Sequence, residues 1–251
     1  MKAINSFVVL VAAVALLLLN TPAQAENTDS RIEASAKQSY VFKTYLQGDD
    51  INVASKDGAV TLTGIVAESY HKSLAQETVA GLPGVKSVDN RLAIKDAEPT
   101  ANSDAWLREK VRVALLFRRS VSASRTEVGV KDGIVTLRGE AGSMAQKELT
   151  AEYAKDVEGV KSVNNEMIVA KASTKKQTVG EKIDDASITA QVKMTLLSHR
   201  STSALNTKVE TKRGVVSLYG KARNAAEMNL ATKLANDVNG VSSVKNRMVI
   251  E

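Results

Sequence analysis

The chain has 251 residues, with 34 lysines and arginines against 28 acidic residues and no cysteine. Without cysteine the fold has no disulfides and must be held together by packing alone, and metal sites built from cysteine and histidine are excluded. The net charge of +6 would suit nucleic acid. However, the beginning of the chain indicates export, so we expect no nucleic-acid partner and, instead, anionic lipid headgroups or acidic protein surfaces.

The first 25 residues have the features of a secretory signal peptide. Lys2 supplies a positive charge, the apolar run Phe7–Leu19 follows, and Ala23-Gln24-Ala25 provides a small-x-small cleavage signal before Glu26. The apolar run is shorter than the roughly 20 residues of a membrane span, and no cysteine follows it for lipidation. We therefore predict a protein that is exported to the periplasm, cleaved and not a lipoprotein. An uncleaved N-terminal anchor is the alternative.

Three copies of one unit follow the signal peptide. Four landmark residues recur after 75 residues and again after a further 81, with identical internal spacing in every copy. Repetition at a fixed period indicates tandem supersecondary modules, which we place at 29–95, 104–170 and 184–251. The repeated positions, which we expect to be structural, are Gly58, Gly64, Gly84 and Asn90, then Gly133, Gly139, Gly159 and Asn165, then Gly214, Gly220, Gly240 and Asn246.

Each unit is predicted to open with an amphipathic helix and continue into a hairpin. In the second unit Leu107, Val111 and Leu115 form an apolar stripe, and Asp104 is placed to cap the helix, as is Asp185 in the third. Two short strands at 128–130 and 134–137 then flank Asp132-Gly133, a pair that suits a tight turn because both residues tolerate positive φ. The third unit has Arg213-Gly214 at this turn.

A second helix and a last strand complete each unit. The helices are predicted near 68–82, 143–157 and 224–238, each ended by a left-handed glycine, and the last strand of the second unit at 163–169. The predicted fold class is therefore α+β: three tandem small modules, each α-β-β-α-β with two helices packed on one face of a three-stranded sheet. The units differ in charge, since residues 26–98 carry 8 basic and 11 acidic groups, residues 99–176 carry 14 and 10, and residues 177–251 carry 11 and 7.

The repeated pattern is an amphipathic helix, then (Lys/Asp)-Gly-x-Val-x-Leu-x-Gly, then a helix that ends in Gly-Val-x-x-Val-x-Asn. This pattern resembles the BON domain, and the match covers all three units. The chain is similar to the osmotically inducible periplasmic proteins with tandem BON domains. The resemblance implies a protein of envelope or osmotic stress that binds phospholipid surfaces or unfolded client proteins. The family has no catalytic motif to carry over.

The residues themselves show no catalytic or cofactor chemistry. His71 and His199 are not repeated between units, so we expect both to be exposed side chains and neither to be a ligand or a base. No metal-ligand spacing, nucleophile elbow or phosphate-binding loop occurs. We therefore expect no enzyme activity, no cofactor, no metal and no small-molecule substrate. The repeated asparagines are expected to bond the backbone through their side chains.

The first helix of the second unit carries a second apolar stripe that the other units lack. It contains the only tryptophan of the chain. An aromatic ring beside cations suits a membrane interface or a client protein, and packing against a neighbouring unit is the alternative. The stripe is Trp106, Lys110, Val113 and Phe117, flanked by Arg108, Arg112 and Arg119.

The leading functional hypothesis is therefore a non-enzymatic periplasmic stress protein that contacts anionic phospholipid surfaces or unfolded clients. A passive multi-module scaffold that joins envelope proteins without touching lipid is the alternative, and ion or osmolyte sensing is a third option. The sequence leaves lipid and client binding undecided, because both require exposed apolar residues beside cations.

Overall fold

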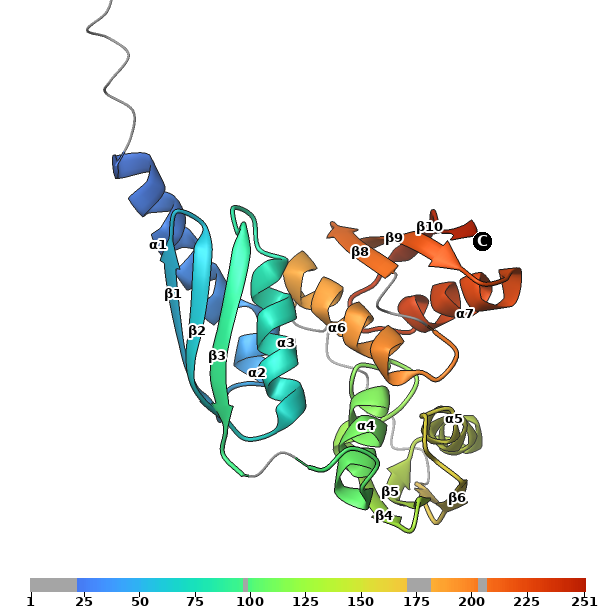
Figure 1. The fold of residues 1–251 in the computed structure, drawn as a ribbon. Coiled ribbons are helices and arrows are strands. Elements are labelled where there is room, and N and C mark those ends of the chain that lie inside the picture. Colours follow the sequence, from blue (N-terminus) through green and yellow to red (C-terminus); the bar gives the residue numbers. More distant parts are fainter. Residues whose placement is uncertain (1–21, 97–98, 171–181, 203–206) are drawn as a thin grey trace, which may run out of the picture.

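The computed structural model describes residues 22–96, 99–170, 182–202 and 207–251 (Figure 1). Residues 1–21 of the predicted signal peptide lie outside the described residues, so the structure does not test it. Within the described residues, no helix is both long and apolar enough to cross a membrane.

The chain folds into three small α+β modules, as the repeat predicted, each with its own sheet (Figure 1). Module 1 contains α1 (Pro22–Gln38), α2 (Tyr40–Thr44), β1 (Asp50–Lys56), β2 (Ala59–Val66), α3 (Ser69–Ala80) and β3 (Ser87–Ile94). Module 2 contains α4 (Asp104–Leu116), the short 3-10 helix η1 (Ala123–Arg125), β4 (Thr126–Lys131), β5 (Ile134–Ala141), α5 (Met144–Lys155), β6 (Ser162–Asn165) and β7 (Ile168–Val169). Module 3 contains α6 (Asp185–Ser198), β8 (Thr207–Lys212), β9 (Val215–Ala222), α7 (Ala225–Asn236), β10 (Ser243–Asn246) and β11 (Val249–Ile250).

The three sheets share one topology. The first two strands of each module form an antiparallel hairpin, and the last strand pairs in parallel with the central one. In modules 2 and 3 the last strand is divided in two, and both pieces pair with the central strand. A parallel pair requires a crossover connection, and the second helix of each module provides it.

An aspartate of the first helix fastens each hairpin turn. The two carboxylate oxygens of Asp104 accept hydrogen bonds from the backbone N–H groups of Asp132 (2.7 Å) and Gly133 (2.9 Å). Asp185 binds the N–H groups of Arg213 and Gly214 in the same way, and Asp29 does so in module 1. The Ser55 hydroxyl, which donates to Asp29, and the turn N–H groups lower the pKa of Asp29, and the turn N–H groups lower the pKa of Asp104, because these bonds favour the charged carboxylate.

Two details of the predicted helix ends are wrong. Ser103 caps α4 by accepting a hydrogen bond from the Trp106 N–H, and Asp184 caps α6. The aspartates predicted as caps stand one residue later and reach the hairpin turns instead. Gly159 and its counterparts have the expected left-handed backbone, but each lies four residues beyond the end of its helix. Helix α5, for example, ends at Lys155, and its C-cap residue Asp156 has a right-handed backbone.

The repeated asparagines connect the last strand to the second helix. The Asn165 side-chain amide donates to the Lys147 carbonyl at 2.7 Å and accepts from the Met167 N–H at 3.3 Å. Asn90 and Asn246 make the corresponding pair of bonds. The side chain therefore satisfies backbone groups at the point where the last strand bends.

Modules 1 and 3 share one hydrophobic core, whereas module 2 has a separate one. Helix α6 lies at the centre of the shared core and packs on α3, α4, α7 and β8 (Figure 1). Eleven of its 14 residues are buried, so the helix is covered on all sides and has no solvent-facing stripe of the usual kind. Its buried polar residues are Ser187, Thr189, Gln191, Thr195 and Ser198.

Gly139 occupies a position in β5 that has no room for a side chain. Its φ is 113°, and a Cβ there would lie 1.9 Å from the Arg125 carbonyl oxygen. We expect Gly139→Ala to lower the free energy of unfolding by about 1–3 kcal/mol or more, because the backbone must leave its native conformation. Thermal denaturation measures the loss. Gly129→Ala is the matched control, since its Cβ would stay 3.9 Å from the nearest atom; equal melting temperatures for the two variants would contradict the prediction.

Gln191 is fully buried on α6, and neither atom of its amide has a hydrogen-bond partner among the described residues. We expect Gln191→Met to raise the free energy of unfolding by about 1–3 kcal/mol, because it removes an unsatisfied polar group at similar volume. Thr189→Val is the contrast, since Thr189 donates to the Thr211 hydroxyl at 2.7 Å and its loss should be destabilising. A Gln191→Met protein that melts below the parent would refute this account.

Candidate functional site between the modules

Modules 2 and 3 contact each other reciprocally at the ends of their helices. The Arg119 N–H donates to the Asp237 carbonyl at 2.9 Å, and the Arg200 N–H donates to the Asp156 carbonyl at 3.2 Å. Arg119 and Arg200 are equivalent residues of the repeat, as are Asp156 and Asp237. The end of the first helix in each module therefore binds the end of the second helix in the other, as in a two-fold symmetric interface.

A buried cation and a buried histidine occupy equivalent places in this interface. The guanidinium of Arg118 is 4.3 Å from the Tyr153 ring centre, and its Nε donates to the Ala114 carbonyl. His199, which is 81 residues further along, is 8% exposed, and its Nε2 lies 3.4 Å from an oxygen of Asp156. Burial lowers the pKa of His199, while Asp156 opposes this effect.

The expectation that both histidines are exposed is wrong. The His199 side chain is buried between modules 2 and 3. The His71 side chain is only 12% exposed, and its Nδ1 lies 2.7 Å from an oxygen of the buried Asp49. The variability of these positions between units reflects contacts particular to each module, which the comparison of units alone does not reveal.

The second apolar stripe of α4 is divided between the interior and a cleft. Val113 and Phe117 are buried in the shared core, where Phe117 packs edge-on against Tyr45 at 5.2 Å between ring centres. For these two side chains the alternative holds, packing against neighbouring units and not contact with a membrane or client, because modules 1 and 3 cover them. Trp106 and Lys110 remain partly exposed, with the Lys110 ammonium 4.1 Å from the Trp106 ring centre.

The arginines that flank the stripe are largely engaged within the protein. Arg112 binds both carboxylate oxygens of Glu68 in module 1, at 2.8 and 2.9 Å. Arg119 donates to the carbonyls of Val238 and Val241 in module 3. Arg108 is exposed and makes no hydrogen bond or ion pair with another described residue. Two of the three cations therefore connect modules and have little capacity left for a membrane surface.

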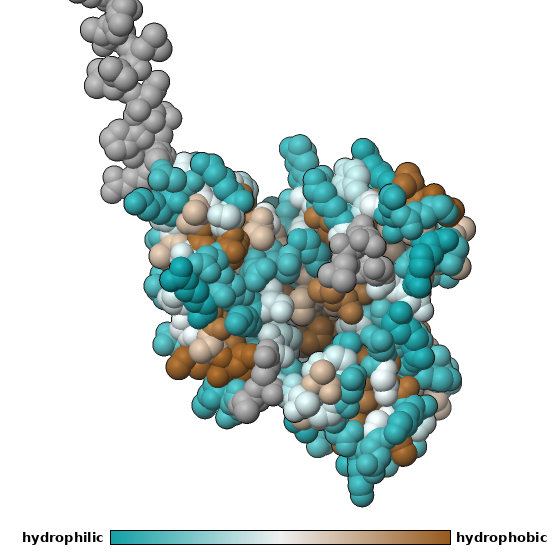
Figure 2. Space-filling model, in the orientation of Figure 1, coloured by the Kyte–Doolittle hydropathy of each residue, from teal (hydrophilic) through white to brown (hydrophobic). Residues whose placement is uncertain are grey.

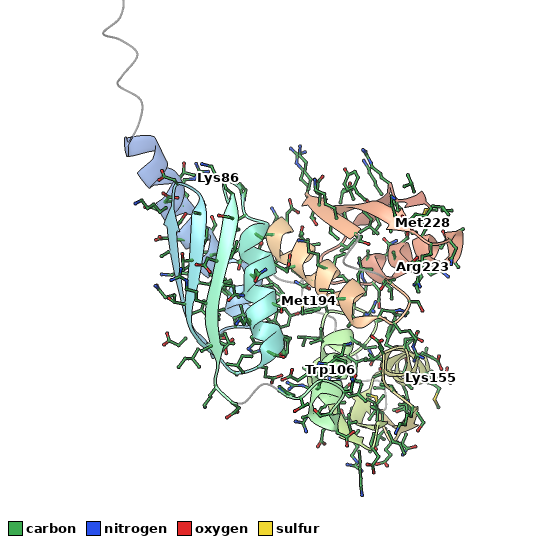
Figure 3. The ribbon with its side chains drawn as sticks, viewed as in Figure 1. Lys86, Trp106, Lys155, Met194, Arg223 and Met228 are labelled. Atoms are coloured by element: carbon green, nitrogen blue, oxygen red, sulfur yellow. The ribbon has the colours of Figure 1, made fainter. Side chains whose placement is uncertain are left out.

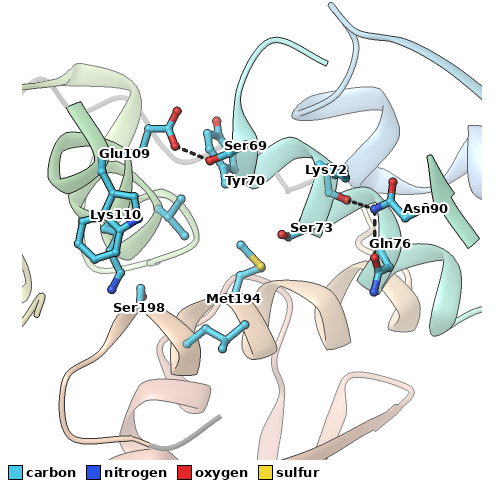
Figure 4. Close-up of a pocket in the computed structure, with 13 residues that line it drawn as sticks. Ser69, Tyr70, Lys72, Ser73, Gln76, Asn90, Glu109, Lys110, Met194 and Ser198 are labelled. Carbon is cyan, nitrogen blue, oxygen red and sulfur yellow. Dashed lines mark hydrogen bonds between the residues drawn. The ribbon is translucent and has the colours of Figure 1, made fainter. Parts of the chain in front are cut away.

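A cleft of about 400 Å³ opens where the three modules meet. Figure 2 shows a hollow at this junction with apolar surface at its base, and Figure 3 shows Trp106 on α4 and Met194 on α6 at the junction. One wall is the polar face of α3, the other is α4, and the floor is α6 (Figure 4). The lining is Ser69, Tyr70, Lys72, Ser73, Gln76, Asn90, Trp106, Glu109, Lys110, Val113, Met194, Leu197 and Ser198.

The cleft combines an apolar base with a polar rim. Leu197 is 47% exposed, and both Leu197 and the partly exposed Trp106 line the cleft. On the opposite wall the Ser69 hydroxyl donates to the Glu109 carboxylate at 2.5 Å and so joins α3 to α4 (Figure 4). A concave apolar site with a few polar groups around it is typical of a binding site. Among the described residues, no group of three potential metal ligands occurs.

Comparison with known proteins identifies the repeated unit. The BON domain model matches residues 28–96, 103–171 and 184–251. Over 196 residues, the chain is 35% identical to the osmotically-inducible protein Y of Escherichia coli (strain K12), covering 75% of this chain and 91% of that protein. It is 29% identical to the 21 kDa hemolysin of Actinobacillus pleuropneumoniae, covering 62% of this chain and 72% of that protein. It is 30% identical to the outer membrane lipoprotein DolP of Haemophilus influenzae, covering 45% of this chain and 59% of that protein.

The stability of the interface between modules 2 and 3 should depend on pH through His199. Its folded-state pKa lies below the ordinary value of 6.5, so the unfolded chain binds the proton more readily. The free energy of unfolding should be unaffected by this group above about pH 7 and fall as the pH decreases through 6.5. Arg118 and Arg200 contribute to the lowered pKa, and Asp156 opposes it.

We expect His199→Gln to reduce the loss of melting temperature between pH 7 and pH 5, as measured by thermal denaturation across that range. His71→Gln is the matched control, because it removes the other histidine from module 1, away from this interface. A His199→Gln protein that keeps the full pH dependence of the parent would contradict the assignment.

Proposed function

Because this chain belongs to the BON-domain family, we propose that it is a non-enzymatic protein of the bacterial envelope that acts in osmotic stress and binds partially folded client proteins. The similarity to an osmotically-inducible protein and to an outer membrane lipoprotein supports the cellular role. Export by a cleaved signal peptide remains a prediction from the sequence. The cleft between the modules supports the binding role.

One observation favours clients over lipid: the part of the α4 stripe that stays accessible, Trp106 with Lys110, lines a cleft and does not form a projecting surface. A membrane-binding helix must present its ring and its cations outward together. Here Val113 and Phe117 are buried, and Arg112 and Arg119 bind other modules. A cleft of about 400 Å³ instead suits one or two apolar side chains of an incoming polypeptide.

The rim of the cleft fits an unfolded chain as well as its base does. An unfolded polypeptide brings exposed backbone N–H and C=O groups together with its apolar side chains, and both must be satisfied on binding. Ser73 and Gln76 line the module 1 wall of the cleft, where the Gln76 amide oxygen accepts a hydrogen bond from Asn90 at 3.1 Å and the Gln76 amide nitrogen is a further donor. These groups offer donors and acceptors to backbone without reading a particular sequence, which suits a client binder.

Trp106 supplies a direct measurement of this function. It is the only tryptophan in the chain and it lines the cleft. We expect a permanently unfolded, carboxymethylated model protein to shift the Trp106 emission to shorter wavelength, because the ring loses water when an apolar side chain enters. Leu197→Ser should weaken this binding about tenfold, since about 1.4 kcal/mol of apolar contact is lost.

Leu149→Ser is the matched control: Leu149 is a similarly exposed leucine, 40% against 47% for Leu197, and lies outside the cleft on α5. Equal affinity of the two variants, or no change in emission with the parent, would refute the proposal. An emission shift with anionic vesicles and none with the unfolded protein would favour phospholipid contact. Stable envelope partners in a pull-down, with no emission shift from either the unfolded protein or the vesicles, would favour the passive scaffold.

A further inference from the structure

We propose that the open face of the module 3 sheet is a second binding site, which takes a doubly charged phosphate group. A groove of about 370 Å³ crosses this face, outside the cleft between the modules. Four of its six lining residues are cations, and none is acidic. The lining is Lys212, Arg213, Val215, Ser217, Lys245 and Arg247.

The strand alternation places these side chains away from the core. Val216 and Leu218 of β9 are fully buried, so Val215 and Ser217 between them face the opposite side of the sheet. Lys245 lies beside Ser217 in the parallel register. All four cations are exposed, and none forms an ion pair with another described residue. Their charge is therefore available to a ligand.

The other two modules show that the fold does not require these cations. The module 1 counterparts of the four positions are Lys56, Asp57, Asp89 and Arg91, and the module 2 counterparts are Lys131, Asp132, Asn164 and Glu166. The four positions therefore carry no net charge in module 1, a charge of −1 in module 2 and a charge of +4 in module 3. Arg91 and Asp89 also bind each other at 2.7 Å. Only module 3 concentrates positive charge at these four positions, where Arg247 also lies 5.8 Å from the Tyr219 ring centre.

The turn at Arg213 provides an independent indication. Arg213 has a φ of 53°, like Asp57 and Asp132 in the other modules. Aspartate tolerates the left-handed region better than most side chains, so module 3 has the less favourable residue at this turn. Asp185 holds the turn in place by accepting the N–H groups of Arg213 and Gly214. The arginine gives no evident benefit to the turn, and its side chain contributes a cation to the groove.

The donor set determines the class of ligand. Two guanidinium groups, two ammonium groups and the Ser217 hydroxyl supply donors around one groove, and arginine forks match phosphate oxygens in pairs. A phosphate monoester carries about −1.5 to −2 charges at pH 7 and three acceptor oxygens, more than one carboxylate offers. Two acidic residues lie near the groove: Glu210 is bound by Lys208 at 2.6 Å, and Asp185 accepts the N–H groups of Arg213 and Gly214. The phosphate can belong to a soluble molecule or to a lipid headgroup.

The test transplants residues from the other modules into the groove of the full chain. Arg213→Asp with Lys245→Asn introduces the residues that module 2 carries, so the fold should be retained. We expect the parent to bind pyrophosphate in isothermal titration, or vesicles containing phosphatidic acid in sedimentation, and the double variant to bind at least tenfold more weakly. Added salt should weaken the binding of the parent, because dissolved ions screen the attraction between the groove and the phosphate. The single variant Lys245→Asn should lose less affinity than the double variant. It still tests the proposal if the double variant does not fold.

Lys131→Asp with Lys155→Asn is the control, since it removes the same charge from module 2; Lys155 lies on α5 of module 2 (Figure 3). Binding of pyrophosphate that is lost in the groove variant supports a soluble ligand. Binding only to anionic vesicles, lost in the groove variant, supports a headgroup. Equal binding by groove variant and control, or no binding by the parent in either assay, overturns the proposal. Because the Trp106 cleft is unchanged in these variants, the client assay remains an independent measurement.

Discussion

The arrangement of this protein depends on the burial of one helix. A unit of about 70 residues buries too little apolar surface to be strongly stable alone, and each module covers only one face of its sheet. Helix α6 belongs to module 3 but is enclosed by helices of all three modules. Because α6 is the floor of the cleft and its neighbours are the walls, the packing that stabilises the modules also forms the candidate binding site.

The local features of the fold were predictable because the sequence repeats them. Asp132-Gly133 and its counterparts adopt the positive φ values expected of the turn, and the asparagines bond the backbone as expected. The surroundings of α6 were not predictable in this way. Ser187 and Gln191 are polar and suggest a solvent-facing side, yet both are buried by modules whose residues are far away in the sequence. A pattern within one helix does not indicate how many neighbours the helix has.

The same limit applied to the stripe on α4. Val113 and Phe117 required an apolar environment, and the sequence was equally consistent with a membrane, a client and a neighbouring module. The structure places them in the shared core, which leaves Trp106 as the accessible part. His199 was misjudged for the same reason, because its partner Asp156 belongs to another module. Contacts between modules are long-range, and only the three-dimensional arrangement specifies them.

Divergence between copies is the most informative signal in a repeated chain. The three modules share one backbone fold, so the fold does not dictate the residue at a position that differs between modules. A difference that lowers local stability therefore requires another explanation. Trp106 corresponds to Arg31 and Ser187, and Arg213 corresponds to Asp57 and Asp132.

The two proposed sites also respond differently to ionic strength: apolar contact in the cleft is insensitive to screening, whereas an exposed cationic groove loses affinity as salt rises. An increase in external salt would therefore weaken phosphate binding in the proposed groove more than apolar contact in the proposed cleft.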